Sequence, residues 1–323
     1  MIVERRELPN RLEEIRDMAR MILARSRDLI EIDSDAIIEI LVPRINQHLE
    51  NQRTDNWIPA GSMLSLEQEL GLNLFLNVIN FCYKDPQTGR EYTYIDKAGR
   101  SIKRATGLIT ALADSGVAWD NFAEILKLDE DRWNNMLQLS NGNILYLGHE
   151  RRDRVVKMAK YALRQGPTTI IDYLESSKFN ALNLVNNLSE SGLFNDEFLK
   201  RAQLASRMIS DVFQRRTGRP LFATENLTVM ADYRIPQVFY NLGVVNLNDS
   251  SLMAKLMAEE PVESGSRYEL SLRATAVSVG EVVAHNLGVI EASVDGYLWG
   301  LSQEMVKKGE MKIPHMLVAT DAY

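Results

Sequence analysis

The segment MADYRIPQ, which begins at Met230, brings together an acid, a phenol and a guanidinium, as Asp232, Tyr233 and Arg234. Two residues further on stands Pro236, which suits the first turn of a helix and keeps the residue before it out of the helical region. The carboxylate of Asp232 therefore lies just before a predicted helix start. Such a carboxylate can act in catalysis, and it can equally be an ordinary helix cap.

A lysine at the head of an apolar row is the second candidate for chemistry. Lys200, Leu204 and Met208 recur every four residues, which aligns them on one face of a helix predicted for residues 195–216. A buried ammonium either loses its proton or needs an anionic partner. The ordinary alternative is a lysine with a buried stem whose charge reaches water.

Three asparagines align on one face of another predicted helix. Asn73, Asn77 and Asn80 stand at i, i+4 and i+7 within residues 66–83. Asparagine is a poor helix former, so the row is either a solvated stripe or a ladder of amides that faces a polar cavity. Next to it, Phe81 offers a ring on which a planar base can stack, although a phenylalanine at this spacing is more often part of the core.

Polar and aromatic residues also gather further along the chain. The segment VDGYLWG carries Asp295, Tyr297 and Trp299 within a predicted long helix. An aspartate beside aromatic side chains can face either a pocket or its rim. Glu269 and Arg273 stand four residues apart, and we expect them to form an ordinary pair along one helix.

The composition indicates a globular protein and weighs against several classes. The 323 residues carry a formal net charge of −7. Duplex DNA or RNA binders need a basic face for the phosphates, so we expect no duplex nucleic acid partner, whereas a small anionic ligand needs only a few local cations. The single cysteine, Cys82, allows no intramolecular disulfide and favours a cytoplasmic location.

Other functional signatures are missing from the sequence. The charged start MIVERRELPN does not fit a signal peptide, and no apolar run has the length of a membrane span. The four histidines lack metal-binding spacing, and there is no dinucleotide, P-loop or hydrolase-elbow motif. We therefore expect no metal, no cofactor and no membrane partner.

The hydrophobic pattern predicts a mainly α protein with one small β-hairpin. Ser65 and Gln68 form a capping box that opens a helix running to about Tyr83. Residues 84–100 place proline and glycine around the sequence EYTYI, which is typical of a hairpin, and residues 315–320 could form a short strand. The other predicted helices cover residues 4–25, 34–49, 103–115, 119–126, 131–139, 150–165, 195–216, 268–286 and 290–307.

Four segments occur in an order and at distances typical of one family. They are FLNVINFCY, FLKRAQ, TVMADYRIPQVFYNLG and VDGYLWG, and the most specific parts are ADYRIPQ and NFCY. Together they resemble the queuosine salvage family, also called queuosine 5′-phosphate N-glycosylase/hydrolase. The resemblance implies a single domain over residues 1–323, with a helical N-terminal part at 1–60 and a family-like core at 61–323.

The resemblance implies an enzyme that cleaves the N-glycosidic bond of queuosine 5′-monophosphate. The products are ribose 5-phosphate and queuine, which returns to tRNA modification. The implied fold is similar to helical DNA glycosylases, in which a lysine on a helix is followed by a loop and a catalytic aspartate. Lys200 and Asp232 match that order, and Asp232 takes the place of the catalytic carboxylate.

The resemblance also implies a base pocket. Met230 takes the place of the aromatic or apolar pocket residue two before the catalytic acid, and Asp295, Tyr297 and Trp299 keep their places in a motif resembling LDYYLWD. Trp57 is our candidate for the region where relatives carry a pocket histidine. Gly296, Gly300 and Lys84 depart from the family pattern, so these residues affect the details of base recognition.

The implied substrate has a phosphate dianion at one end and a secondary ammonium on its base. Lys200 and Arg234 are candidates for the phosphate end, and Asp295 for the ammonium or the cyclopentenediol. The substrate-binding residues expected overall are Asn80, Phe81, Met230, Tyr233, Arg234, Asp295, Tyr297, Trp299 and Trp57.

Two other functions stay open at this point. One is a glycosylase or hydrolase of the same fold that acts on another nucleoside or nucleotide. The other is a non-catalytic helical module that binds queuine or tRNA. The first differs from the queuosine hypothesis in its substrate, and the second predicts binding without bond cleavage.

Overall fold

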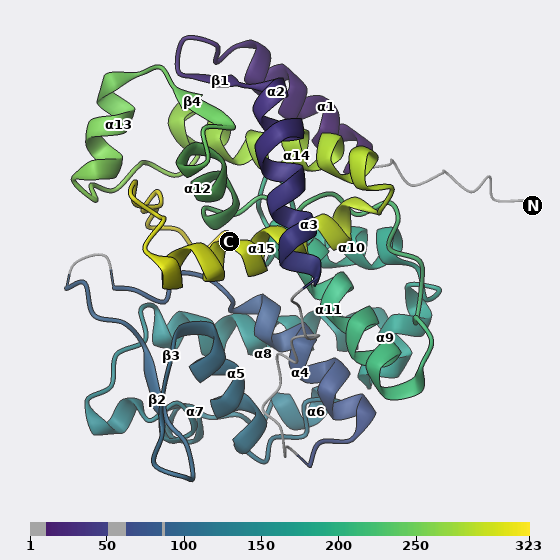
Figure 1. Ribbon diagram of the computed structural model, residues 1–323. Coiled ribbons are helices and arrows are strands. Elements are labelled where there is room, and N and C mark those ends of the chain that lie inside the picture. Colours follow the sequence, from purple (N-terminus) through teal and green to yellow (C-terminus); the bar gives the residue numbers. More distant parts are fainter. Residues whose placement is uncertain (1–10, 51–62, 86–87) are drawn as a thin grey trace, which may run out of the picture.

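Helices account for most of the chain in the computed structural model, which describes residues 11–50, 63–85 and 88–323 (Figure 1). The elements of the first half are α1 (Arg11–Ala24), β1 (Ile30–Ile32), α2 (Ser34–Ala36), the π-helical segment η1 (Ile37–Leu41), α3 (Val42–Glu50), α4 (Leu66–Val78), β2 (Thr93–Ile95), β3 (Ser101–Lys103), α5 (Arg104–Asp114), α6 (Phe122–Ile125), α7 (Glu130–Met136), the short helix η2 (Leu139–Asn141) and α8 (Gly148–Gln165). Those of the second half are α9 (Ile170–Ser176), α10 (Ala181–Glu190), α11 (Lys200–Thr217), α12 (Arg234–Asn241), β4 (Val245–Leu247), α13 (Ser250–Met257), α14 (Arg267–Leu287) and α15 (Glu291–Lys308).

One continuous hydrophobic core joins these elements, so the predicted single, mainly α domain is confirmed. In Figure 1, α4 to α8 and α1 with α12 to α14 lie on opposite sides of α15. The closest packing partners are α4 with α11, α1 with α14, and α12 with α15. Similarity to helical DNA glycosylases remains a prediction. Among the described residues, none of the helices combines the length and the apolar character that a membrane crossing needs.

Two small antiparallel sheets complete the fold of the described residues. The predicted hairpin is confirmed, although its second strand, β3, lies just beyond the predicted range and pairs Tyr94 with Ile102. The second sheet pairs β1 with β4, with Glu31 opposite Asn246, and the sequence did not indicate it. The predicted strand at residues 315–320 is wrong, because Leu317 makes only an isolated bridge with Pro261.

The start of α4 follows the prediction, and its end does not. Ser65 forms the predicted capping box with Gln68. The helix ends at Val78, five residues early, because two buried arginines bind the carbonyl groups at its C-terminal end. Arg201 donates to the oxygens of Asn77 and Val78 at 3.0 and 2.6 Å. Arg151 donates to the oxygens of Phe81 and Cys82 at 2.6 and 2.8 Å. Cations at a helix C-terminus also suit the helix dipole.

Arg201 also ties the last described residues of the chain to this helix end. Its Nη2 donates to the oxygen of Asp321 at 2.9 Å, and its Nε donates to the oxygen of Ala322 at 2.8 Å. One guanidinium therefore binds α4 and the segment 321–322 at the same time.

The asparagine row on α4 is buried, so the solvated stripe is wrong. Asn73 and Asn77 donate to the carbonyl oxygens four residues earlier, at 2.8 and 2.9 Å, and Asn77 also lies 3.4 Å from the Met208 sulfur on α11. The row continues to Asn80, which accepts a 2.7 Å hydrogen bond from the Tyr83 hydroxyl. The amide ladder therefore lies in the interface between α4 and α11.

Candidate active site

Three charged side chains from distant parts of the sequence form the centre of the candidate site. Lys200 is the first residue of α11, Asp232 stands two residues before the start of α12, and Asp295 lies in the second turn of α15. The two carboxylates are the principal charges acting on Lys200, and Asp232 is the principal charge acting on Asp295. The structure thus brings together three of the residues that the sequence singled out.

Lys200 is buried and not a surface lysine with its charge in water, since only 9% of it is exposed. Burial lowers the pKa of Lys200, while the carboxylates of Asp232 and Asp295 oppose that shift. Within the described part of the chain, no hydrogen bond or ion pair involves its ammonium group, whereas its backbone N–H donates to Asp196 at 2.8 Å. A buried ammonium without a fixed partner is available to a ligand.

Asp232 caps the start of α12, which is one of the two roles that its position suggested. Its Oδ1 accepts the backbone N–H groups of Arg234 at 2.7 Å and Ile235 at 3.1 Å, which are the first free donors of α12. Among the described residues, no donor binds its Oδ2. The cap fixes the orientation of the carboxylate, and the second oxygen remains available for chemistry.

Asp295 is held against the segment that carries Asp232. Its Oδ1 accepts the backbone N–H of Met230 at 2.9 Å. Burial and the neighbouring Asp232 raise the pKa of Asp295 to about 7, although Met230 N–H, Lys200 and Arg207 oppose the shift. The carboxyl group therefore exchanges its proton close to neutral pH. Titrating groups in such surroundings are common in active sites.

A cationic and aromatic group lies next to this acidic centre. The rings of Tyr233 and His315 are 4.7 Å apart, and the Arg234 guanidinium lies 5.9 Å from the Tyr233 ring. Burial and Arg234 lower the pKa of His315 to about 4, so the ring is neutral at physiological pH. Arg234 donates to the Gln237 amide at 3.2 Å, and no described carboxylate forms an ion pair with it. A half-buried cation without a carboxylate partner favours an anionic ligand.

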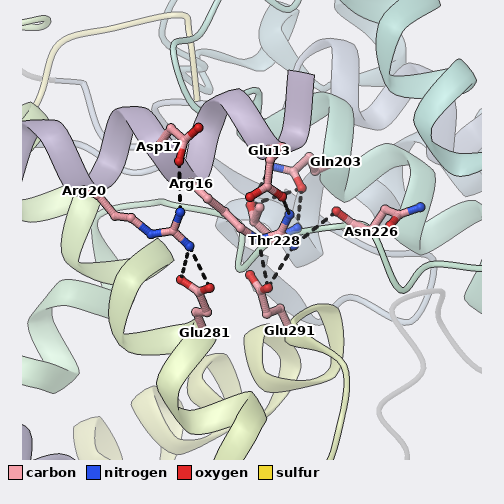
Figure 2. A network of polar contacts seen from close by, with 9 residues as sticks. All are labelled: Glu13, Arg16, Asp17, Arg20, Gln203, Asn226, Thr228, Glu281 and Glu291. Atoms are coloured by element: carbon pink, nitrogen blue, oxygen red, sulfur yellow. Dashed lines mark hydrogen bonds and ion pairs between the residues drawn. The ribbon is translucent and has the colours of Figure 1, made fainter. Parts of the chain in front are cut away.

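Two clamps hold the segment 226–232 in place (Figure 2). Gln203 on α11 accepts the Thr228 N–H at 2.8 Å and donates to the Thr228 hydroxyl at 2.9 Å. Arg16 on α1 binds Glu291 at 2.8 Å and the Asn226 carbonyl at 3.4 Å. Because Glu291 opens α15, Arg16 joins the helix that bears Asp295 to the segment that bears Asp232.

Other predicted site residues have different surroundings. The Phe81 ring is 1% exposed and lies 4.0 Å from the Arg151 guanidinium, so it packs on a buried arginine, and its stacking on a base stays a prediction. Met230 is equally buried and contributes its backbone N–H. The side-chain oxygen of Asn80 already accepts the hydrogen bond from the Tyr83 hydroxyl. Tyr297 and Trp299 are half-buried on α15, and Trp57 lies outside the described residues.

His315 and Arg273 belong to the site region, and the sequence did not indicate either role. His315 stands in the segment wrongly predicted as a strand, and no spacing links it to Tyr233. Arg273 was predicted to form an ordinary pair with Glu269. That pair exists at 2.8 Å, but it is buried and continues to Asp196 and Ala231. Among the described residues, no three acidic, histidine or cysteine side chains are grouped as metal ligands.

A buried lysine under the electrostatic influence of two carboxylates, on a helical scaffold, defines a class of site suited to acid–base or glycosidic chemistry. Comparison with known proteins agrees with this class. The family model described as "Queuosine salvage protein" matches residues 65–321, so the chain belongs to the queuosine salvage protein family.

Three curated relatives carry the name queuosine 5′-phosphate N-glycosylase/hydrolase. The relative from Schizosaccharomyces pombe is 27% identical over 114 residues, which is 34% of this chain and 33% of the relative. The relative from Dictyostelium discoideum is 34% identical over 120 residues, or 34% and 36% of the two chains. The relative from Sphaerobacter thermophilus is 30% identical over 116 residues, or 33% and 35%. Each alignment spans about a third of the relative's length.

Proposed function

We propose that this protein hydrolyses the N-glycosidic bond of queuosine 5′-monophosphate and releases queuine and ribose 5-phosphate. The observation that carries the proposal is the cluster of buried Lys200 with half-buried Asp232 and Asp295, formed within the part of the chain that matches the family. The names of the three relatives support the choice of substrate.

The chemistry requires a fixed negative charge beneath the sugar. As the C–N bond breaks, the base takes the bonding electron pair and then a proton, and the sugar becomes oxocarbenium-like. The Oδ2 oxygen of Asp232 is the group that we assign to this positive charge. Removing one well-placed group of this kind typically costs about 3 kcal/mol of transition-state stabilisation. Water then adds its oxygen to the anomeric carbon and releases its proton.

The charges around the centre match the two ends of the substrate. Arg234, which has no described carboxylate partner, is our candidate for the phosphate, with Tyr233 beside it. Lys200 lies under the influence of both carboxylates, so we now place it nearer the reacting bond than the phosphate. Asp295 is our candidate for binding the ammonium of the base. Tyr297 and Trp299 are our candidates for the rim of the base pocket.

We expect the reaction to take place in the cytoplasm.

The test is to incubate the protein with queuosine 5′-monophosphate and to detect free queuine by mass spectrometry. Asp232→Asn should lower turnover at least about 100-fold, because the variant lacks the negative charge. The asparagine keeps an Oδ1 acceptor for the N–H groups of Arg234 and Ile235, so the thermal midpoint should stay close to that of the wild type. Near-normal turnover in this variant would remove Asp232 from its role.

A substrate panel separates the two alternatives. An enzyme for another nucleotide would turn over an ordinary purine nucleotide faster than queuosine 5′-monophosphate. A non-catalytic module would bind queuine or tRNA and release no base from any substrate. The queuosine proposal predicts release from the queuosine nucleotide and no retention of duplex RNA in a gel-shift assay at physiological salt.

A further inference from the structure

Arg273 on α14 is one of the most deeply buried side chains of the described chain, with 1% of it exposed. All three nitrogen groups of its guanidinium have partners. Nε donates to the Ala231 oxygen at 2.8 Å, Nη1 donates to Glu269 at 2.8 Å, and Nη2 donates to Asp196 at 2.8 Å. The group is therefore a junction between three segments and not only a pair within one helix.

Two of these partners lead directly to the proposed reacting groups. Ala231 is the residue before Asp232. Asp196 accepts the backbone N–H of Lys200 at 2.8 Å, and it accepts this bond through Oδ2, the oxygen that Arg273 binds. One rigid guanidinium thus connects the backbone at Asp232 with the backbone at Lys200.

The start of α11 needs such support, because its backbone is strained. Leu199, which directly precedes Lys200, has φ of +49°, in the left-handed region that a leucine rarely adopts. Strained residues of this kind persist where surrounding contacts hold them and are concentrated at functional sites. The bonds from Asp196 to Lys200 and from Arg273 to Asp196 are contacts that can hold this turn.

Aromatic rings restrict the Arg273 side chain further. The Tyr323 ring lies 3.7 Å from its guanidinium carbon, and the Phe198 ring lies 4.7 Å from it. A planar guanidinium stacked in this way presents its donors in a fixed fork, which a lysine ammonium does not reproduce. The stacked guanidinium of Arg273 is therefore a rigid link, and it sets the distance between the segment of Lys200 and the segment of Asp232.

We propose that Arg273 is a positioning residue that fixes Lys200 relative to Asp232 through Asp196 and Ala231. The inference rests on the proposed function, since its consequence is a faster chemical step. A displacement of about 1 Å in a reacting group can lower the rate on the order of 100-fold. Arg273 itself touches no substrate in this scheme.

The first test is Arg273→Lys, which keeps the charge and removes the fork. We expect kcat for queuosine 5′-monophosphate to fall about 100-fold and KM to change less than about threefold. Arg151→Lys is the matched control, because Arg151 is equally buried and binds four backbone carbonyls, none of them at residues 196, 200, 231 or 232. The Arg151→Lys variant should have a lower thermal midpoint than the wild type. Its kcat should stay within about threefold of the wild-type value when the assay temperature is well below that midpoint.

A double mutant distinguishes positioning from general destabilisation. Lys200→Met removes the group that Arg273 positions, so adding Arg273→Lys to it should lower the residual rate only slightly. The proposal would be contradicted if the losses in kcat of the two single variants multiplied in the double variant. It would also be contradicted if Arg273→Lys and Arg151→Lys lost kcat to the same extent. If Arg273→Lys does not fold, Asp196→Asn serves instead, since it weakens the same bridge and should give the same kcat-specific loss.

A structural measurement separates failure of this inference from failure of the proposed function. If the wild type releases no queuine, the proposed function fails, and crystal structures of the wild type and of Arg273→Lys still test the bridge. We expect residues 231–232 and the first turn of α11 to move apart in the variant. Superimposable segments in the two structures would overturn the inference even if the wild type is an active enzyme.

Discussion

At the scale of single residues, Asp295 links the proposed chemistry to the stability of the fold. Its pKa of about 7 in the folded protein lies above the ordinary value of 3.8, so the fold holds this proton more tightly than the unfolded chain. Stability from this group is present at low pH and is lost as pH rises through about 7. The groups that act on it are Asp232, Lys200, Arg207 and the Met230 N–H.

Asp295→Asn should therefore stabilise the protein at alkaline pH. The asparagine cannot ionise, and its oxygen can still accept the Met230 N–H. We expect a gain in the free energy of unfolding that grows from about pH 4 to pH 7 and reaches at most about 4 kcal/mol above it. Thermal unfolding at pH 5 and pH 8 checks this, and a gain of the same size at both pH values would contradict it.

The Asp295→Asn variant should also bind a cationic substrate more weakly than the wild type at pH 8.

Some of the site could be predicted from the sequence, and the reasons differ between residues. Asp232 stands before a proline-marked helix and Lys200 heads an apolar row, so local patterns singled out both as candidates and left an ordinary cap and a surface lysine as alternatives. His315 and Arg273 gain their roles from partners at Tyr233, Ala231 and Asp196, which no short-range pattern connects to them. For Phe81, no local pattern separates a ring that stacks on a base from a ring that packs on a buried arginine, as this one does on Arg151.

At the scale of elements, one close approach decides where the Asp232 segment can lie. A Cβ atom at Gly280 on α14 would be 2.2 Å from Cγ2 of Val229 and 2.9 Å from its Cβ. Only a glycine therefore lets α14 pack this closely against the segment, three residues before Asp232.

Gly280→Ala should displace the segment and impair both stability and turnover. We expect the free energy of unfolding to fall by about 1–3 kcal/mol, as for other overpacked sites. Turnover should fall at least about tenfold, because Asp232 moves with Val229. Gly296→Ala on α15 is the matched control for stability: its Cβ would meet nothing within 4 Å, so it should gain about 1 kcal/mol. Denaturant unfolding of both variants checks the contrast, and similar behaviour would refute it.

How well the end of a helix or the pairing of a strand can be predicted depends on how far apart in the sequence the interacting residues lie. Capping and glycine signals are local, and they gave the start of α4 and the ends of α8 and α14 to within one or two residues. The end of α4 depends on Arg201 and Arg151, and the start of α11 depends on Asp196, so both differ from prediction by about one turn or more. The pairing of β1 with β4 joins three-residue strands too short to show alternation.

At the scale of the whole molecule, the residues before the family match are part of the same structure. Arg16 binds Glu291, His48 lies 2.7 Å from Glu304 on α15, and β1 pairs with β4. Large aliphatic side chains of this region are buried in the common core, namely Leu12, Ile15, Leu29, Ile30, Ile37, Leu41 and Ile45.

Removing residues 1–50 should therefore abolish cooperative folding, although the family match begins at residue 65. Each large buried aliphatic contributes roughly 1.5–3 kcal/mol. Their loss together is comparable to the whole stability of a typical domain, about 5–15 kcal/mol. Circular dichroism during thermal unfolding checks this. A sharp transition near the midpoint of the full chain would show that the matched region folds alone.

The double attachment of Arg201 has a consequence for synthesis of the protein. This side chain binds α4 and the carbonyls of Asp321 and Ala322, and the neighbouring Arg273 is covered by Tyr323. On the ribosome, residues 321–323 are made after Lys200, Asp232 and Asp295. Until they emerge, two buried arginines lack part of their surroundings in the native core. The geometry that we propose for catalysis is therefore completed only after Lys200, Asp232 and Asp295 have all been translated.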